Sequence, residues 1–210
     1  MTKELLFDYI SSASGLFPVI AFLYNYKHLD KTFKIIAAFF IVAVLFDIVL
    51  RLWTAWGIGN NYPVIHVFVI INIIFFGLIY YKAFFIKKVK RLTIILSAIA
   101  FLIAVYFTKN LNDYPSEGNT ASSIVFIILS LIYFYQLLSR QEFVLIEKQG
   151  LFWFNAGVLF YFSINIFLFM LFPKIPKDQQ ASYYIINNIT NIIANLLYTT
   201  GLLCQPQKTT

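Results

Sequence analysis

Seven long apolar stretches divide the chain, and short polar segments separate them. They cover residues 10–26, 33–53, 64–85, 92–107, 122–138, 151–172 and 182–204. Each is close to the roughly 20 residues that a helix needs to cross about 30 Å of hydrocarbon. The apolar residues run continuously instead of alternating over segments of about ten residues, which excludes the strands of a transmembrane barrel. The pattern therefore predicts an all-α membrane protein, with seven transmembrane helices in a single polytopic domain over residues 1–210.

The composition agrees with surroundings of lipid and not of water. Of the 210 residues, 60% are hydrophobic and only 12% are charged, whereas roughly a quarter of a soluble domain is charged. The formal net charge of +7 would suggest nucleic acid in a soluble protein. Here the basic residues flank the apolar stretches, as topology signals do. We therefore expect the lipid bilayer as a partner and no nucleic acid.

Lysine and arginine gather on one side of the predicted helices. Eleven of the 16 lie in the first, third and fifth connections and after the last helix: Lys27, Lys31, Lys34, Lys82, Lys87, Lys88, Lys90, Arg91, Arg140, Lys148 and Lys208. The other side holds five: Lys3, Arg51, Lys109, Lys174 and Lys177. Short cytoplasmic loops collect basic residues. The sequence therefore predicts an N-terminus outside the cell and a C-terminus in the cytoplasm.

The chain carries signs of an internal repeat. Asn72 with the two isoleucines after it in the third helix matches Asn191 with the two isoleucines after it in the seventh. Asp47 in the second helix matches Asn165 in the sixth at nearly the same spacing. The ends of the first and fifth helices share the pattern Tyr-x-Tyr, then leucine, then a basic residue. Chance similarity among helices rich in isoleucine, leucine and phenylalanine is the alternative.

Such a repeat divides the chain into two three-helix bundles of the same orientation with a linker helix between them. In chain order, the three parts cover residues 10–85, 92–107 and 122–204. This three-plus-one-plus-three architecture resembles the SWEET sugar transporters and their relatives. In that family an asparagine from the third helix and one from the seventh face each other across the solute site, which implies this role for Asn72 and Asn191. The family's transport helices carry hinge prolines in both triplets, whereas here only Pro18 lies inside a predicted helix.

A second resemblance covers nearly the whole chain. It rests on residues 26–34, which read Tyr-Lys-His-Leu-Asp-Lys-Thr-Phe-Lys, on Asn60 and Asn61 with His66, and on residues 152–157, which read Phe-Trp-Phe-Asn-Ala-Gly. These segments are similar to short seven-helix membrane proteins of Bacteroidota bacteria, a group with no assigned activity. The resemblance implies the bacterial inner membrane as the location, and it implies no site residues.

Ionisable groups inside the predicted helices mark candidate functional positions, because they are costly in a membrane. Asp47 and Arg51 lie four residues apart on one face of the second helix, as an intrahelical ion pair near the outer boundary would. Either the pair is structural, with Arg51 extending to the headgroups, or Asp47 is a proton or cation site. His66 in the third helix either titrates in contact with water or is a hydrogen-bonded packing residue.

The seventh predicted helix carries an unusual number of asparagines. Spacings of three and four place Asn188, Asn191 and Asn195 along one face, between Tyr184 and Tyr198. Asparagines can simply hydrogen-bond one helix to another, but three or four amides on one stripe exceed what holding two helices requires. We therefore expect a ligand-binding site made from the following residues: Asp47, His66, Asn72, Asn165, Asn188, Asn191 and Asn195.

Most of these polar residues fall in the outer half of the predicted helices or near the membrane midplane. The sequence thus predicts a polar cavity that is open to the outside. On the cytoplasmic side, bulky aromatic residues are expected to close it: Tyr24, Tyr26, Tyr133 and Phe152. Such a cavity suits a transporter held in one state, and it suits a receptor equally.

Catalysis is the class of function that the sequence supports least. The two histidines fall on opposite sides of the predicted membrane, and no cysteine or carboxylate cluster accompanies either, so we expect no metal site, no cofactor and no enzyme activity. Facilitated transport of a small polar solute between two triple-helix halves is the first hypothesis. The alternative is a seven-helix sensor or accessory subunit that relays a ligand signal to a cytoplasmic or membrane partner. Either function is compatible with a homo-oligomer.

Overall fold

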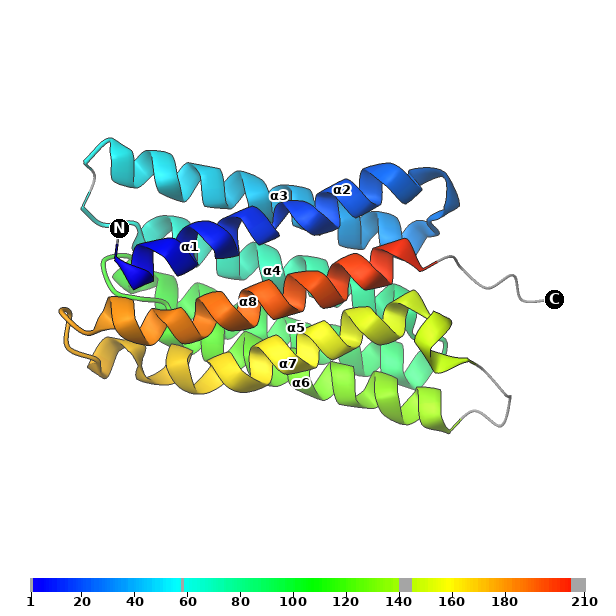
Figure 1. Ribbon diagram of the computed structural model, residues 1–210. Coiled ribbons are helices and arrows are strands. Elements are labelled where there is room, and N and C mark those ends of the chain that lie inside the picture. Colours follow the sequence, from blue (N-terminus) through cyan, green and yellow to red (C-terminus); the bar gives the residue numbers. More distant parts are fainter. Residues whose placement is uncertain (1, 58, 140–144, 205–210) are drawn as a thin grey trace.

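The computed structural model describes residues 2–57, 59–139 and 145–204, and these residues form helices and short connections without a strand (Figure 1). The α-helices are α1 (Lys3–Ser14), α2 (Leu16–Asn25), α3 (Lys31–Ala55), α4 (Tyr62–Ala83), α5 (Lys87–Phe107), α6 (Ser116–Leu138), α7 (Gly150–Leu171) and α8 (Gln180–Leu203). Single 3₁₀ turns cover Tyr26–His28, Thr108–Asn110, Ile146–Lys148 and Phe172–Lys174. The all-α prediction is confirmed for this part of the chain. Arg140 and Lys208, two basic residues behind the predicted orientation, lie outside it.

Within the described ranges, six helical segments are long and apolar enough to cross a membrane. They are Lys3–His28, Lys31–Ala55, Tyr62–Ala83, Lys87–Asn110, Ser116–Leu138 and Gly150–Lys174. Helix α8 has 24 residues, which is also enough to span, but its asparagines and threonines make it less apolar. Six such segments fit a multi-pass helical membrane protein. The seventh span, the orientation and the repeat stay predictions.

The first predicted helix consists of two pieces, α1 and α2, with a break at Gly15. Pro18 has no N–H group, so the carbonyl group of Ser14 loses the donor that a continuous helix would supply. The chain tightens there, and the N–H group of Gly15 donates to the carbonyl oxygen of Ser12 at 3.1 Å. Both pieces, drawn in blue, run lengthwise along the bundle in Figure 1.

Every predicted helix begins earlier than the hydrophobic pattern predicts, and the shifts are largest in α1 and α6, where polar residues start the helix. Helix α1 begins at Lys3 instead of residue 10. The side chain of Thr2 caps this helix, because its hydroxyl oxygen accepts a hydrogen bond from the N–H group of Leu5 at 3.4 Å. Helix α6 begins at Ser116 instead of residue 122. The hydroxyl group of Ser116 donates to the carbonyl oxygen of Phe169 at 2.8 Å. The polar first turn of α6 is therefore part of the bundle.

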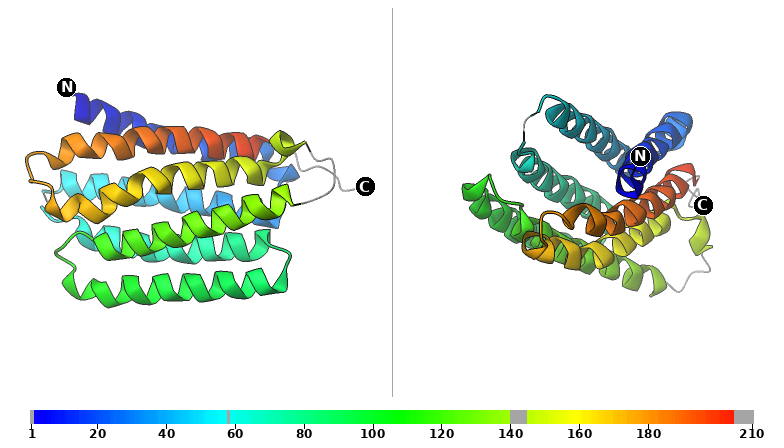
Figure 2. Two further views of the ribbon diagram at one scale, coloured as in Figure 1. Left: turned by 90° about the horizontal axis from the view of Figure 1, so that it is seen from below. Right: turned by 60° about the vertical axis from the view of Figure 1, so that its left-hand side comes forward.

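Most helices pack against their neighbours in the sequence. Helix α7 lies between α6 and α8, and α8 packs against both α1 and α2. Helix α4 contacts α3, α5 and α6, while α2 contacts α3. Six segments thus follow one another around the bundle, and α5 lies outside this ring on α4 and α6, at the edge seen in Figure 2. We refer to the end that carries the N-terminus as the N-terminal end and to the opposite one as the C-terminal end.

Aromatic side chains fill the middle of the bundle. Phe76 of α4 stacks on Phe126 of α6 with ring centroids 4.4 Å apart, and it meets Phe162 of α7 edge-on at 5.7 Å. Toward the C-terminal end, the hydroxyl group of Tyr80 donates to the Oδ1 atom of Asn155 at 2.8 Å, and both side chains are buried. These contacts hold α4, α6 and α7 together.

At the C-terminal end, α7 and α8 approach closely at two glycines. A Cβ atom on Gly201 would lie 2.7 Å from the carbonyl oxygen of Gly150, a distance that no side chain can adopt without moving the backbone. Helix α2 fastens α8 from another side, because the amide nitrogen of Asn25 donates to the carbonyl oxygen of Leu202 at 2.9 Å. Helix α8 is therefore held firmly at this end.

Candidate functional site

A cavity of about 280 Å³ extends from the N-terminal end toward the middle of the bundle, between α1, α3, α4, α6, α7 and α8. Eleven aromatic side chains line it, together with six asparagines: Asn72, Asn119, Asn187, Asn188, Asn191 and Asn195. Five of the seven predicted site residues are among its lining residues: Asp47, Asn72, Asn188, Asn191 and Asn195. The structure thus brings most of the predicted residues to one enclosed space.

Helix α8 contributes the longest polar wall of this cavity. Asn188, Asn191 and Asn195 share one face of the helix with Tyr184 and Tyr198, and all five line the cavity. The outward face of α8 is apolar, since its exposed residues include four isoleucines and leucines in the stretch 186–196. The prediction that the asparagine stripe faces the interior is therefore confirmed.

Part of the asparagine stripe joins α8 to α1. The amide nitrogen of Asn191 donates to the hydroxyl oxygen of Ser11 at 2.9 Å, and that of Asn195 donates to the hydroxyl oxygen of Ser14 at 2.8 Å. Both serines are buried, and such small side chains let two helices approach closely. Hydrogen bonding between helices therefore accounts for the amide nitrogens of these two side chains.

Other polar atoms of the lining have no protein partner among the described residues. The buried Oδ1 atom of Asn72 accepts no hydrogen bond. Asn188 lines the cavity without a hydrogen bond to any described group, and the side-chain oxygens of Asn191 and Asn195 are likewise unbonded. A buried amide group without a partner costs about 1–3 kcal/mol. Hydrogen-bond donors placed in the cavity would therefore be bound favourably.

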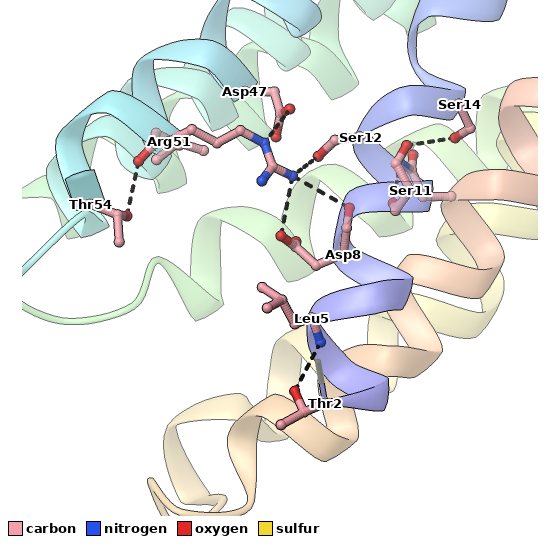
Figure 3. A network of polar contacts seen from close by, with 11 residues as sticks. Thr2, Leu5, Asp8, Ser11, Ser12, Ser14, Asp47, Arg51 and Thr54 are labelled. Carbon is pink, nitrogen blue, oxygen red and sulfur yellow. Dashed lines mark hydrogen bonds and ion pairs between the residues drawn. The ribbon is translucent and has the colours of Figure 1, made fainter.

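A charged network spans the gap between α1 and α3 at the cavity (Figure 3). The Nε atom of Arg51 donates to the Oδ2 atom of Asp47 at 3.2 Å, which confirms the predicted ion pair within α3. The Nη2 atom of the same side chain donates to the Oδ2 atom of Asp8 in α1 at 3.2 Å and also to the hydroxyl oxygen of Ser12. The carboxyl side chains of Asp8 and Asp47 are 45% and 43% exposed. The cavity therefore reaches the surface beside this network.

Sequence reasoning missed Asp8, because the predicted first helix began only at residue 10, and it also missed Ser12 inside that helix. A signal was present: Asp8, Ser11, Ser12 and Gly15 recur at spacings of three and four, the periodicity of one helix face. All four line the cavity. The partner of Asp8 could not be read from this pattern, because Arg51 lies 43 residues away in the chain.

Two predicted site residues lie apart from the cavity lining. The Nε2 atom of His66 is 3.1 Å from the carbonyl oxygen of Asp113 in the α5–α6 connection, and the residue is buried, as the hydrogen-bonded packing interpretation expects. Asn165 is buried between α7 and α8, where its amide nitrogen donates to the hydroxyl oxygen of Thr190 at 2.6 Å. Both side chains connect helices here.

The expected closure by Tyr24 and Tyr26 is wrong, because these side chains are 85% and 51% exposed on the outside of the bundle. The cavity ends instead on aromatic rings near the middle of the bundle. Phe40 of α3 contacts Tyr198 of α8 with ring centroids 5.0 Å apart, and Phe162 of α7 lies against the Phe76 and Phe126 pair. Five helices thus contribute one side chain each to an aromatic floor, which we define as Phe40, Phe76, Phe126, Phe162 and Tyr198.

The chemical groups that line the cavity are mainly amide and aromatic side chains. Over the described ranges, no three His, Cys, Asp or Glu side chains gather as metal ligands would. The lining instead combines amide groups, two carboxylates held by a guanidinium group, and aromatic rings. No protein-family model, no curated protein and no solved structure matches this chain, so its function has to be inferred from the cavity itself.

Proposed function

We propose that this chain is a seven-helix membrane protein that binds a small polar solute in the cavity and transports it across the bilayer. The observation that carries this proposal is the amide-lined cavity, which is open beside Arg51 and ends on the aromatic floor. Polar cavities near the midplane between helices are the usual solute sites of secondary transporters. The N-terminal end would face the outside, as the distribution of basic residues predicts.

Helix α8 would then be the seventh span. Its 24 residues extend about 36 Å at 1.5 Å per residue, enough to cross the hydrocarbon core. Its polar groups face the cavity and α1, while Ile186, Ile189, Ile193 and Leu196 are exposed on the outside. A helix that is polar inward and apolar outward satisfies both its neighbours and lipid, which supports a spanning position despite its moderate hydropathy.

The packing also supports a two-bundle arrangement like that of the SWEET-type transporters. Helix α5 lies outside the ring of the other helices, as a linker would. Asn72 of α4 and Asn191 of α8, the corresponding residues of the two predicted triplets, both line the cavity. In such an arrangement the solute binds between the two halves, and transport requires the aromatic floor to separate while the N-terminal end closes.

Solute-dependent thermal unfolding tests the binding step. Purified protein in lipid nanodiscs would be heated with sugars, nucleosides, amino acids, amines and vitamins in turn, because a ligand at 100 times its Kd adds about 2.7 kcal/mol to the stability of the folded state. We expect one class of small solute to raise the Tm. The increase should be lost in Asn72→Ala and in Asn188→Ala and retained in Asn110→Ala, a matched change at an exposed position outside the cavity.

Flux into liposomes tests the transport step with the solute identified in this way. Uptake that saturates with solute and falls in Asn188→Ala would support transport. Binding without any flux would contradict transport and leave a sensor that reports the solute to a partner protein. If no small solute raises the Tm, the binding site itself is refuted.

A further inference from the structure

The charge on the cavity wall has one sign. Asp8 and Asp47 line the cavity, whereas no Lys, Arg or His side chain does. Arg51 bonds both carboxylates from beside the cavity. Two carboxylates with one guanidinium group leave a net charge of −1 at the entrance. An anionic solute would therefore meet repulsion there, and a cationic solute would meet attraction.

The rest of the lining suits a positive charge as well. Tyr114, Tyr161, Tyr184 and Tyr198 line the cavity with seven phenylalanines, and the faces of aromatic rings attract cations, above all when water is excluded. The guanidinium group of Arg51 already lies 5.0 Å from the ring centroid of Tyr9 at this end of α1. The cavity wall thus offers π faces to a cation beside its hydrogen-bonding groups.

The amide groups add oxygen atoms to this wall. The amide nitrogens of Asn191 and Asn195 are directed to the serines of α1, so their side-chain oxygens stay without a described partner. The buried Oδ1 atom of Asn72 is also unpaired and belongs to a residue that lines the cavity. Amide oxygens accept hydrogen bonds and attract positive charge. An N–H donor or an ammonium group would satisfy them.

From these observations we infer that the solute is a small organic cation with an ammonium group, held between the Asp8 and Asp47 carboxylates, the amide oxygens and the aromatic rings. The inference rests on the proposed solute-binding function and names its substrate class. The volume of about 280 Å³ lies just below the usual range of ligand sites, which starts near 300 Å³. A compact amine or quaternary ammonium ion fits such a space.

A pair of isosteres isolates the role of charge. Choline and 3,3-dimethylbutan-1-ol have the same shape, but only choline carries a positive charge. We expect choline to bind the purified protein at least about tenfold more tightly, since cation–π and ionic contacts are lost with the charge. Isothermal titration in detergent free of ammonium lipids would measure both affinities. Equal binding of the two probes would overturn the inference.

Substitutions at the entrance should change the affinity for choline in opposite directions. Asp47→Asn removes one negative charge from the wall and should weaken choline binding about tenfold. Arg51→Gln removes the neutralising charge and should strengthen it. Glu117→Gln is the matched control, because Glu117 is exposed at the same end of the bundle and does not line the cavity. Asp8→Asn repeats the test if Asp47→Asn does not fold, and equal effects of all these variants would refute the charge model.

The ammonium group can come from a free solute or from a lipid headgroup. Titrating choline into protein that already contains phosphatidylethanolamine, in otherwise ammonium-free micelles, separates the two sources. If the lipid headgroup occupies the site, choline has to displace it and its apparent affinity falls. If the site takes only a free solute, the affinity for choline is unchanged by the lipid. Tight binding of neutral sugars or nucleosides with no binding of choline would refute the organic cation and leave the solute-binding function standing. Absence of binding by any probe would refute both.

Discussion

The two halves of the bundle hold their helices together by different means. In the N-terminal half, long polar side chains bridge the helices: Arg51 joins α3 to α1, and Asn191 and Asn195 join α8 to α1. In the C-terminal half, α7 and α8 meet at Gly150 and Gly201 with no side chain between them. Side-chain bridges leave room for a cavity, whereas close backbone contact leaves none. The difference explains why the cavity lies in the N-terminal half, which we call the open half, and not in the C-terminal half, which we call the closed half.

The largest expected effect is a loss of stability when the close contact between α7 and α8 in the closed half is disrupted. Gly201→Ala places a methyl group 2.7 Å from the carbonyl oxygen of Gly150, so the helices must move apart. We expect a loss of about 3 kcal/mol in the free energy of unfolding, the upper end for overpacking. Thermal unfolding would measure it against Gly59→Ala, where an added Cβ atom has nothing within 4 Å. Equal stability of the two variants would show that this contact does not close the bundle.

A smaller loss is expected when a buried hydrogen bond of the closed half is removed. Asn155→Ala leaves the hydroxyl group of Tyr80 buried without the acceptor that it has at 2.8 Å. The expected destabilisation is about 2 kcal/mol. The double variant with Tyr80→Phe should recover part of this loss, because it also removes the unpaired hydroxyl group. If the loss in the double variant equals the sum of the losses in the two single variants, the two side chains do not interact and the bond is contradicted.

Removing the charged bridge of the open half should change stability by only about 1 kcal/mol, because its members are partly exposed. Arg51→Gln loses the bonds to Asp8 and Asp47 at 3.2 Å. The local effect should be larger than the global one, since α1 is then held mainly by α2 and α8. Hydrogen exchange of α1 amides should become faster while that of α7 stays unchanged. If hydrogen exchange becomes faster to the same extent in all helices, the bridge does not act locally on α1.

The smallest loss of stability is expected at Asn188. Asn188→Ala removes a buried amide that makes no hydrogen bond with a described residue, so the free energy of unfolding should fall by less than about 0.5 kcal/mol, the lower limit for losing a hydrogen bond. Asn195→Ala is the comparison, because it leaves Ser14 without the bond at 2.8 Å and should cost about 1 kcal/mol. The reverse order of the two losses would mean that Asn188 is structural.

Local sequence patterns predicted the parts of the site that lie within one helix. The asparagine stripe of α8 and the Asp47–Arg51 pair both follow from spacings of three and four residues. The membrane spans follow equally from continuous apolar stretches, and six of the seven satisfy the length and hydropathy of a span in the described structure.

Contacts between distant helices could not be predicted in this way. Ser11 and Asn191 are 180 residues apart, and nothing local in either helix indicates the other. Whether Tyr24 is buried depends on which helices α2 packs against; these are α8 and α3, and Tyr24 stays exposed. His66 likewise bonds the α5–α6 connection instead of the cavity, because the packing of α4 turns it that way.

The asparagines of α8 bear on how the protein is assembled during synthesis. A helix with four buried asparagine and threonine side chains in its central turns, Asn187, Asn188, Thr190 and Asn195, partitions poorly into lipid when it is alone. The hydroxyl groups of Ser11 and Ser14, which accept hydrogen bonds from two of its amides, belong to α1, which is synthesised before α8. Helix α8 is therefore made after the serines that its asparagines bond, so these partners are available as soon as it folds.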